Sequence, residues 1–287
     1  MSKICKSLDL NKLFNEQAKG KLLKKHMLFP MFGSIKYDGN YVCIQVQGKN
    51  RTFNTSGGLT YTHTDSAGDI FDGVYDGAYF AERIAGEGKL GDRDRCNLRG
   101  SKSDQTSTGH SYRVFDYVSI EDYIRGYSEM PFLARKKLLA ESGLPIENIA
   151  RQLIFSNQDN LDNYMKDMVR QGWEGMMLVS PAHEWKDTKS RTVDLVKYKL
   201  RPTVDLLCVG TTEGEGKYEG MVGALVLQDS NFRTVSVGSG LSDMARSLGD
   251  EHIGRVYEVE YERMTEESYI QPTLIRHRED KDATDID

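Results

Sequence analysis

Five charged side chains stand at the ends of apolar runs, where isolated charge is unexpected. Lys36 precedes an Asp-Gly turn signal in SIKYDGNY, Glu82 follows AYFA, and Glu174 opens EGMMLV. Lys197 and Lys199 alternate with apolar residues in LVKYKL, so a strand would point both lysines to one face. Burying like charges on one face is costly unless an anion joins them. The pattern therefore indicates a site for a phosphate, and a nucleotide is the natural candidate.

Lys36 is the candidate nucleophile of this set. Free lysine, with a pKa of about 10.4, is neutral in roughly one molecule in 2,500 at pH 7. We expect Lys197, Lys199, a divalent metal and partial burial to favour the neutral amine of Lys36. Lys-x-Asp-Gly by itself occurs by chance in about one chain in fifteen of this length. The prediction of phosphorus chemistry therefore depends on the whole set.

The elements that must position these residues are short strands and two helices. Gly, Asn and Asp turn signals between residues 33 and 80 predict antiparallel strands. Met130–Ser142 and Asn160–Gln171 have helix end signals, with Pro131 near the first start and Asn160 as the second cap. The other predicted elements are a basic helix at 9–25, a Gly-, Asp- and Arg-rich connection at 86–109, and strands at Tyr112–Val118, Gly175–Val179 and Leu195–Lys199.

The pattern of predicted elements changes at Arg201-Pro202. Short strands with turns between them follow, and one short helix at 243–248 has Ser242 as its predicted cap. This content suits a small closed barrel of the OB type. We place the boundary at 202, between a domain at 1–202 and a domain at 203–287. The predicted strands are Val204–Thr211, Gly223–Gln228, Thr234–Val237 and Val256–Arg263.

Composition describes a globular protein without a membrane segment. Of the 287 residues, 38% are hydrophobic and 28% charged, and no window approaches the roughly 18 apolar residues of a membrane span. The four cysteines are scattered, which favours reduced thiols and a cytoplasmic location, host cytoplasm if the source is viral. The net charge of −5 conceals a basic start, +5 over residues 1–30, and an acidic tail, −4 over 279–287. Charge alone leaves two readings open, phosphate-backbone binding or a solvated helix and disordered tail.

The charged set, in this order, resembles the covalent nucleotidyltransferases, most closely ATP-dependent DNA ligases of bacteriophage type. KYDG at 36–39 resembles the motif whose lysine becomes attached to AMP, and its carboxylate, Asp38, is counted with the catalytic residues. The resemblance implies an α+β fold, with an adenylation domain of antiparallel sheets flanked by helices before an OB-fold β-barrel domain. It also implies ATP as the AMP donor and Mg²⁺ as cofactor.

The resemblance assigns roles to further residues, each at its motif position. Lys197 and Lys199 would contact the α-phosphate and act in catalysis, and Phe115 would stack on adenine. Glu174 and Glu82 would be the metal-binding carboxylates. The remaining nucleotide contacts would be Ser34, Ile35, Arg51 at the ribose or the nick phosphate, and Arg278 and Lys281 at the leaving pyrophosphate.

Several positions depart from the family pattern. Tyr41 stands where an arginine is common, Phe80-Ala81 replaces the Asp-Gly that usually precedes the third-motif glutamate, and Val179 replaces a frequent lysine. These departures leave adenylation possible but weaken the assignment of ribose and nick contacts. Arg93, Arg95 and Arg99 could grip DNA, yet they lie among acidic residues.

The expected function is sealing of 5′-phosphate/3′-hydroxyl nicks in duplex DNA through lysyl-AMP and DNA-adenylate intermediates. Only 35 residues precede Lys36, which favours ATP over NAD, and the compact build favours a monomer of phage origin. The alternatives are an RNA ligase, an mRNA-capping guanylyltransferase, and a non-catalytic nucleic-acid binder containing an OB domain. The segments GKYEGMVGAL and GSGLSD favour the DNA ligase.

Overall fold

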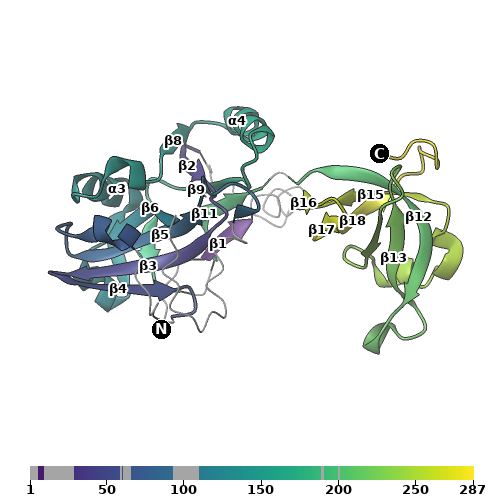
Figure 1. Ribbon diagram of the computed structural model, residues 1–287, viewed down its shortest axis with the longest axis horizontal. Coiled ribbons are helices and arrows are strands. Elements are labelled where there is room, and N and C mark those ends of the chain that lie inside the picture. Colours follow the sequence, from purple (N-terminus) through teal and green to yellow (C-terminus); the bar gives the residue numbers. More distant parts are fainter. Residues whose placement is uncertain are drawn as a thin grey trace. The chain divides into compact units, whose positions relative to one another are not determined.

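The chain divides into two compact units, Met1–Leu200 and Arg201–Asp287 (Figure 1). The computed structural model describes residues 6–9, 29–58, 60, 66–92, 110–188, 191–199 and 201–287. The expected basic helix, except for Asp9, and the arginines 93, 95 and 99 lie outside these residues. None of the described helices is both long and apolar enough to cross a bilayer.

A five-stranded sheet in unit 1 carries Lys197 and ends next to Lys36 and Lys199. Its strand order is β1-β11-β9-β2-β8, and all neighbouring pairs are antiparallel except β1 with β11. Helix α4, Gln158–Arg170, packs Leu161 and Met165 onto one face of it. The strands are β1 Lys6–Asp9, β11 Arg191–Tyr198, β9 Met176–Val179, β2 Met31–Ile35 and β8 Gln152–Phe155.

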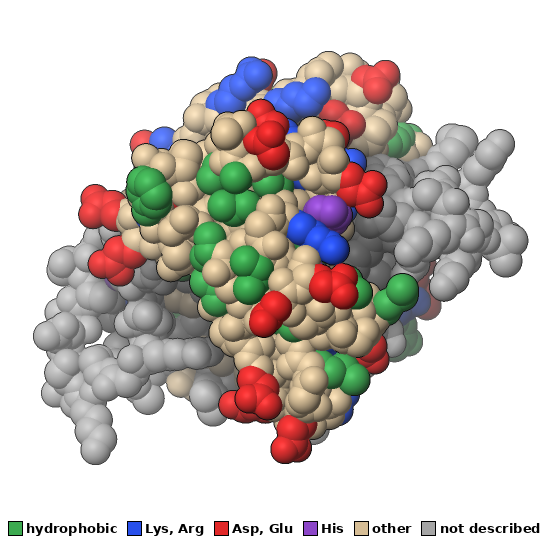
Figure 2. Space-filling view, turned by 90° about the vertical axis from the view of Figure 1, so that its right-hand side faces the viewer, with side chains coloured by type: hydrophobic (Ala, Val, Ile, Leu, Met, Phe, Trp, Pro, Cys, Tyr) green, Lys and Arg blue, Asp and Glu red, His purple; other side chains and the backbone are tan. Residues whose placement is uncertain are grey.

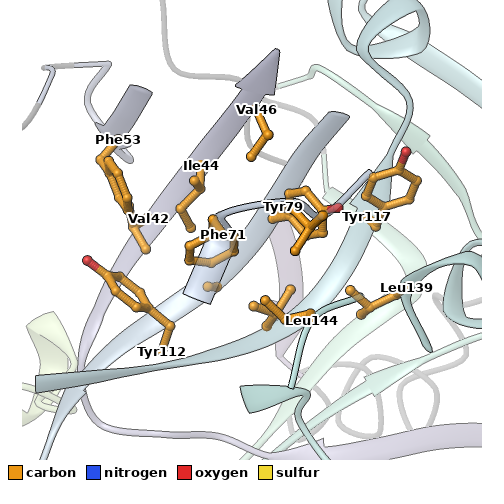
Figure 3. Close-up of a cluster of buried hydrophobic side chains, with 13 residues drawn as sticks. Val42, Ile44, Val46, Phe53, Phe71, Tyr79, Tyr112, Tyr117, Leu139 and Leu144 are labelled. Atoms are coloured by element: carbon orange, nitrogen blue, oxygen red, sulfur yellow. The ribbon is translucent and has the colours of Figure 1, made fainter. Parts of the chain in front are cut away.

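A four-stranded antiparallel sheet, in the order β4-β3-β5-β6, forms the other large layer of unit 1. Side chains alternate across its strands, so Val42, Ile44 and Val46 of β3 enter the core shown in Figure 3. Cys43 points to the opposite face and is also buried. The sheet is thus packed on both faces, and the second face borders the site. Its strands are β4 Asn50–Thr55, β3 Asn40–Gln47, β5 Gly77–Ala85 and β6 His110–Val118.

The two predicted helices exist, but both begin elsewhere than expected. Helix α3, Phe132–Glu141, starts after Pro131 because Tyr127–Pro131 is a strand, β7, paired with β10, Glu184–Lys186. Helix α4 starts earlier than predicted, because Asn157 is its cap and accepts from the Asn160 backbone N–H at 2.9 Å. The other helical segments of unit 1 are η1 Ser66–Phe71, α2 Ile120–Arg125 and η3 Ile146–Asn148.

Unit 2 is a curled five-stranded sheet in the order β14-β13-β12-β15-β18, with its own hydrophobic core. Ser242 caps α5, Asp243–Arg246, as predicted, by accepting from the Ala245 N–H at 3.1 Å. The strands are β12 Thr203–Glu213, β13 Val222–Gln228, β14 Thr234–Val237, β15 Val256–Glu260 and β18 Thr273–His277, and the smaller elements are η4 Gly216–Tyr218, η5 Gly249–His252, β16 Arg263–Met264 and β17 Tyr269–Ile270.

The barrel of unit 2 is not closed by a continuous ladder, contrary to the expectation from sequence. Among its described strands, β14 and β18 are the two sheet edges, and the Leu274 N–H donates to the Ser239 carbonyl at 2.9 Å across the seam. The chain approaches closely there because Gly240, at φ +90°, has no Cβ to strike the Leu274 carbonyl. β14 is only four residues long and ends at Val237, before it could pair with β18.

The acidic tail is folded onto unit 2. The Asp205 N–H donates to the Asp287 carboxylate at 2.8 Å, and the Ser230 N–H donates to the Asp287 carbonyl at 2.8 Å. The visible face shows hydrophobic side chains near its centre and acidic ones around them, with Lys and Arg side chains at the top and beside a histidine (Figure 2). Basic and acidic side chains are thus interspersed on that face.

Candidate active site

A cavity of about 430 Å³ lies in unit 1 between the two large sheets. Six of the predicted site residues line this cavity, and all but Lys36 lie on strands β2, β5, β6 or β11. The six are Ser34, Ile35, Lys36, Glu82, Phe115 and Lys197. A cavity of this size is in the range that small-molecule ligands occupy.

Lys36 leaves the end of β2 directly into this cavity. Its backbone N–H donates to the Gly175 carbonyl at 2.8 Å, which ties the end of β2 to the start of β9. Gly175 also lets the start of β9 lie close to the end of β11, because a Cβ there would strike the Tyr198 carbonyl oxygen. The Lys36 side chain remains 25% exposed, so solvent reaches part of it.

Glu174 bridges Lys36 and Lys199. One carboxylate oxygen accepts from Lys36 Nζ and the other pairs with Lys199 Nζ. The Glu174 side chain is only 5% exposed. Burial alone would raise the pKa of Glu174, but the ammonium groups of Lys36 and Lys199 outweigh it and hold the pKa below its ordinary value. In this state, the Lys36 amine is engaged as a hydrogen-bond donor.

The lysines of β11 take different positions at the site. Val196 and Tyr198 are buried in the core beneath α4, which is the alternation predicted for this strand. Lys197 lines the cavity, whereas Lys199 contacts Glu174 just beyond the end of the strand. The anion that joins Lys199 to Lys36 here is a protein carboxylate, a role that sequence reasoning did not assign to Glu174.

Asp38 stabilises the loop that follows Lys36. Its carboxylate accepts from the Gly91 N–H at 2.8 Å, and its own N–H donates to the Gly88 carbonyl at 2.9 Å. Gly39 then packs against β5, where a Cβ would strike the Arg83 carbonyl. The Asp-Gly pair thus holds the Lys36 loop, and Asp38 is not among the residues that line the cavity.

A β-bulge on β6 places Phe115 at the cavity. Phe80 pairs with Asp116 and Ala81 pairs with Val114, so Phe115 is the extra residue of the bulge. Bulges of this kind redirect side chains and are common beside active sites. Half-buried Phe115 packs near Tyr41, with ring centroids 6.3 Å apart, which leaves it suited to stacking on a planar ligand.

A buried ion pair supports the cavity floor. The Arg135 guanidinium, 1% exposed, donates to both oxygens of Asp116 at 2.9 and 2.8 Å and to the His183 carbonyl at 2.9 Å. Burial first, and the Arg135 charge second, lower the pKa of His183, so its ring is neutral at pH 7. These contacts fix the loop that leads into β10 against β6.

Four predicted nucleotide contacts are not among the residues that line the cavity, and one of them, Lys199, instead contacts Glu174. Arg51 lies on β4 and donates to the Gly68 carbonyl at 2.7 Å. Its guanidinium also lies near the carboxylates of Asp69 and Asp72. Arg278 and Lys281 belong to unit 2, where both contact the buried Asp205 carboxylate at 2.8 Å. Their assigned roles remain predictions.

Sequence reasoning missed a set of cavity residues that come from separate elements. Their signal was weak, because each is an ordinary aromatic or polar residue until the sheets bring it to the wall. Tyr41 stood out only as a departure from the family pattern, and Trp185 is a buried residue that stacks on Phe80 with ring centroids 5.5 Å apart. The set comprises Tyr41, Phe80, Phe132, Gln152, His183 and Trp185.

The comparisons with known proteins all point to DNA ligases. Residues 213–278 match the family described as the DNA ligase OB-like domain. The DNA ligase of Pyrobaculum arsenaticum is 28% identical over 179 residues, which are 58% of this chain and 27% of that protein. The DNA ligase of Pyrobaculum neutrophilum is 31% identical over 162 residues, 52% of this chain and 25% of that protein. The chain thus spans about a quarter of the length of these relatives.

Solved structures match nearly the whole chain. One from a structure–function analysis of Lig E DNA ligases has a TM-score of 0.69 at 16% identity and covers 97% of this chain and 100% of that one. The ATP-dependent DNA ligase from bacteriophage T7, in complex with ATP, has a TM-score of 0.51 at 15% identity and covers 96% and 98%. The chain therefore has the fold of ATP-dependent DNA ligases, a nucleotidyltransferase unit followed by an OB-like unit. The predicted fold class and the resemblance to DNA ligases are confirmed.

Proposed function

We propose that this protein is an ATP-dependent DNA ligase that seals nicks in duplex DNA through an AMP group carried on Lys36. The observation that carries the proposal is the position of Lys36, at the end of β2 and inside a 430 Å³ cavity, in contact with Glu174, which also contacts Lys199 just beyond the end of β11. A lysine held in this way on this fold supports the proposal that it attacks a bound nucleotide.

The first step is attack of the Lys36 amine on the α-phosphorus of ATP. The new bond is P–N, the bond from the α-phosphorus to the bridging oxygen breaks, and pyrophosphate leaves with the electron pair. The proton of the ammonium must leave first. Glu174 is a weak base because its pKa is lowered, so the proton passes to water at the exposed side of Lys36. Phosphate oxygens compete with Glu174 for Lys199, and Lys197 supplies a further positive charge.

The later steps transfer AMP to DNA. A 5′-phosphate oxygen at the nick attacks the lysyl-AMP phosphorus, the P–N bond breaks, and DNA-adenylate forms. The 3′-hydroxyl then attacks the 5′-phosphorus, and AMP departs as the nick closes. These are phosphoryl transfers, so positioning and charge stabilisation supply most of the catalysis. Arg278 and Lys281 are proposed to act on the pyrophosphate, and Arg51 on the ribose or nick phosphate.

Mg²⁺ fits the residues at the site as a phosphate-bound ion. No group of three or more metal-ligating side chains occurs within the described part of the chain. Mg²⁺ is commonly held by one or two carboxylates together with substrate phosphates and water. Glu174, anionic at neutral pH, and Glu82, at the cavity wall, would hold it. When bound, it would neutralise charge on the phosphates.

Mass spectrometry after mixing with ATP and Mg²⁺ tests the proposal. We expect the protein to gain the mass of one AMP, Lys36→Ala to gain none, and the adenylated protein to seal a nicked duplex. Parallel incubations with GTP and with nicked RNA separate this reaction from those of a guanylyltransferase and an RNA ligase. Nucleic-acid binding without any covalent nucleotide would refute it.

A further inference from the structure

Gln152 is a polar residue of the cavity wall to which the proposed reaction assigns no task. It lies on β8 directly opposite Ser34 of β2 in the antiparallel ladder, and both residues line the cavity. Ser34 lies two residues before Lys36 on the same strand. Gln152 therefore lies at the proposed nucleotide site, next to Ser34 and not next to Lys36 itself.

A hydrogen bond fixes the orientation of the Gln152 amide. Its Nε2 donates to the Phe115 carbonyl at 3.2 Å. A carbonyl oxygen can only accept, so the bonded atom must be the nitrogen. No hydrogen bond reaches Oε1 of Gln152 from the residues that the structure describes. One hydrogen of Nε2 is used in this bond, so the side chain has Oε1, which can only accept, and the second Nε2 hydrogen to offer a ligand.

We propose that Oε1 of Gln152 accepts a hydrogen bond from the amino group of adenine and so selects ATP over GTP. The inference rests on the proposed function, because it concerns the base of the nucleotide that Lys36 attacks. Phe115 supplies the stacking face, and the carbonyl of the same residue holds the amide that meets the base edge. The residue at the bulge, Phe115, would therefore serve recognition of both the face and the edge of adenine.

The chemistry of the two purines decides the preference. Adenine presents its N6 amino group as a donor, whereas guanine presents O6, an acceptor, at the same place. With GTP, guanine O6 would face Gln152 Oε1. Both are acceptors, so no hydrogen bond would form between them at the partly buried cavity wall, and this is unfavourable. Sites built around one hydrogen bond reject analogues that cannot make it far better than sites that depend on shape alone.

Equilibrium binding of nucleotides that cannot react provides the test. Calorimetry would compare the α,β-methylene analogue of ATP with the same analogues of GTP and of purine riboside triphosphate, which lacks the amino group. We expect the wild type to favour the adenosine analogue over the purine riboside analogue at least about tenfold, or about 1.4 kcal/mol. Gln152→Met removes the acceptor at similar length and should bring the two affinities within about twofold.

The matched control is Gln158→Met on α4, because the Gln158 amide bonds to Asp162 at 2.6 Å and does not line the cavity. It should keep the wild-type preference, and Gln152→Leu repeats the test if the methionine variant folds poorly. Full preference in the Gln152 variants, or none in the wild type, overturns the inference. A wild type that shows the preference but never forms lysyl-AMP supports Gln152 and refutes the proposed reaction, whereas a wild type that binds no nucleotide overturns both.

Discussion

Replacing Glu174 by glutamine should test the charge bridge at the site directly. Glu174→Gln keeps the shape of the side chain but removes the negative charge that joins Lys36 and Lys199. The two ammonium groups would then face each other across a neutral amide. We expect the folded state to lose stability at pH 7, because like charges gathered at a half-buried site lose their counter-ion.

The size of the loss follows from the exposure of the three side chains. Removing one partner of a fully buried ion pair costs about 3–5 kcal/mol, whereas an exposed pair contributes about 0–1 kcal/mol. Glu174 is 5% exposed, but Lys36 and Lys199 remain 25% and 17% exposed, so water can solvate the orphaned ammonium groups. We therefore expect about 2 kcal/mol, which lowers Tm by about 4–8 °C in a unit of this size.

The pH dependence of this loss has a definite sign. The pKa of Glu174 is lowered on folding, so its contribution is present above the ordinary value of 4.5 and disappears as pH falls through the lower folded pKa. A protonated glutamate and a glutamine are then nearly equivalent. The difference in Tm between wild type and Glu174→Gln should therefore be full at pH 7 and close progressively below pH 4.5.

Thermal unfolding followed by circular dichroism between pH 7 and pH 3.5 provides the assay. Glu184→Gln is the matched control, because Glu184 pairs with Lys186 at 3.3 Å and both side chains are about half exposed. It should shift Tm by no more than about 1 °C. An equal Tm for wild type and Glu174→Gln at pH 7, or a difference that does not change with pH, would refute the reasoning.

Three further perturbations probe other parts of the structure. Arg135→Met leaves the buried Asp116 carboxylate without its guanidinium and should cost about 3–5 kcal/mol in urea unfolding; a cost as small as that of the exposed Arg170→Met would contradict this. Gly175→Ala forces a Cβ against the Tyr198 carbonyl and should slow AMP attachment at least about tenfold, since small displacements at a reacting group are costly. Gly57→Ala, whose Cβ would meet only the Thr55 hydroxyl at 3.7 Å, should leave the rate unchanged. Asp205→Asn weakens the contacts of Arg278 and Lys281 and should speed tryptic cleavage after Lys281; unchanged cleavage would show that Asp205 does not hold the tail.

The local pattern of the sequence was sufficient wherever neighbouring residues decide the structure. The alternation in LVKYKL predicts that Val196 and Tyr198 are buried, and they are, because side chains of a strand alternate between faces. Ser242 caps α5 as predicted, because a cap bonds to a backbone group three residues away. The Asp-Gly pair after Lys36 likewise indicates a tight loop, and Gly39 fits where a side chain would collide.

Features that depend on distant segments could not be predicted in this way. The start of α3 moved because Tyr127–Pro131 pairs with a strand more than fifty residues later. The acidic tail is held in place and not disordered, because the Asp287 carboxylate accepts a hydrogen bond from the backbone of Asp205, near the start of unit 2 in the sequence. The bulge that exposes Phe115 depends on the register between β5 and β6, which no local signal sets.

The sequence by itself was enough to predict the proposed chemistry of this protein, because a candidate lysine nucleophile, further lysines and carboxylates stand in an order typical of nucleotidyl transfer. Only the tertiary structure decided which of these groups meet. It joined Lys36 to Glu174 across 138 residues of chain and set Gln152 opposite Ser34. Residue types carry pKa values and donors wherever they stand, but contact between them depends on strand pairing that forms when both sheets bury their apolar faces together.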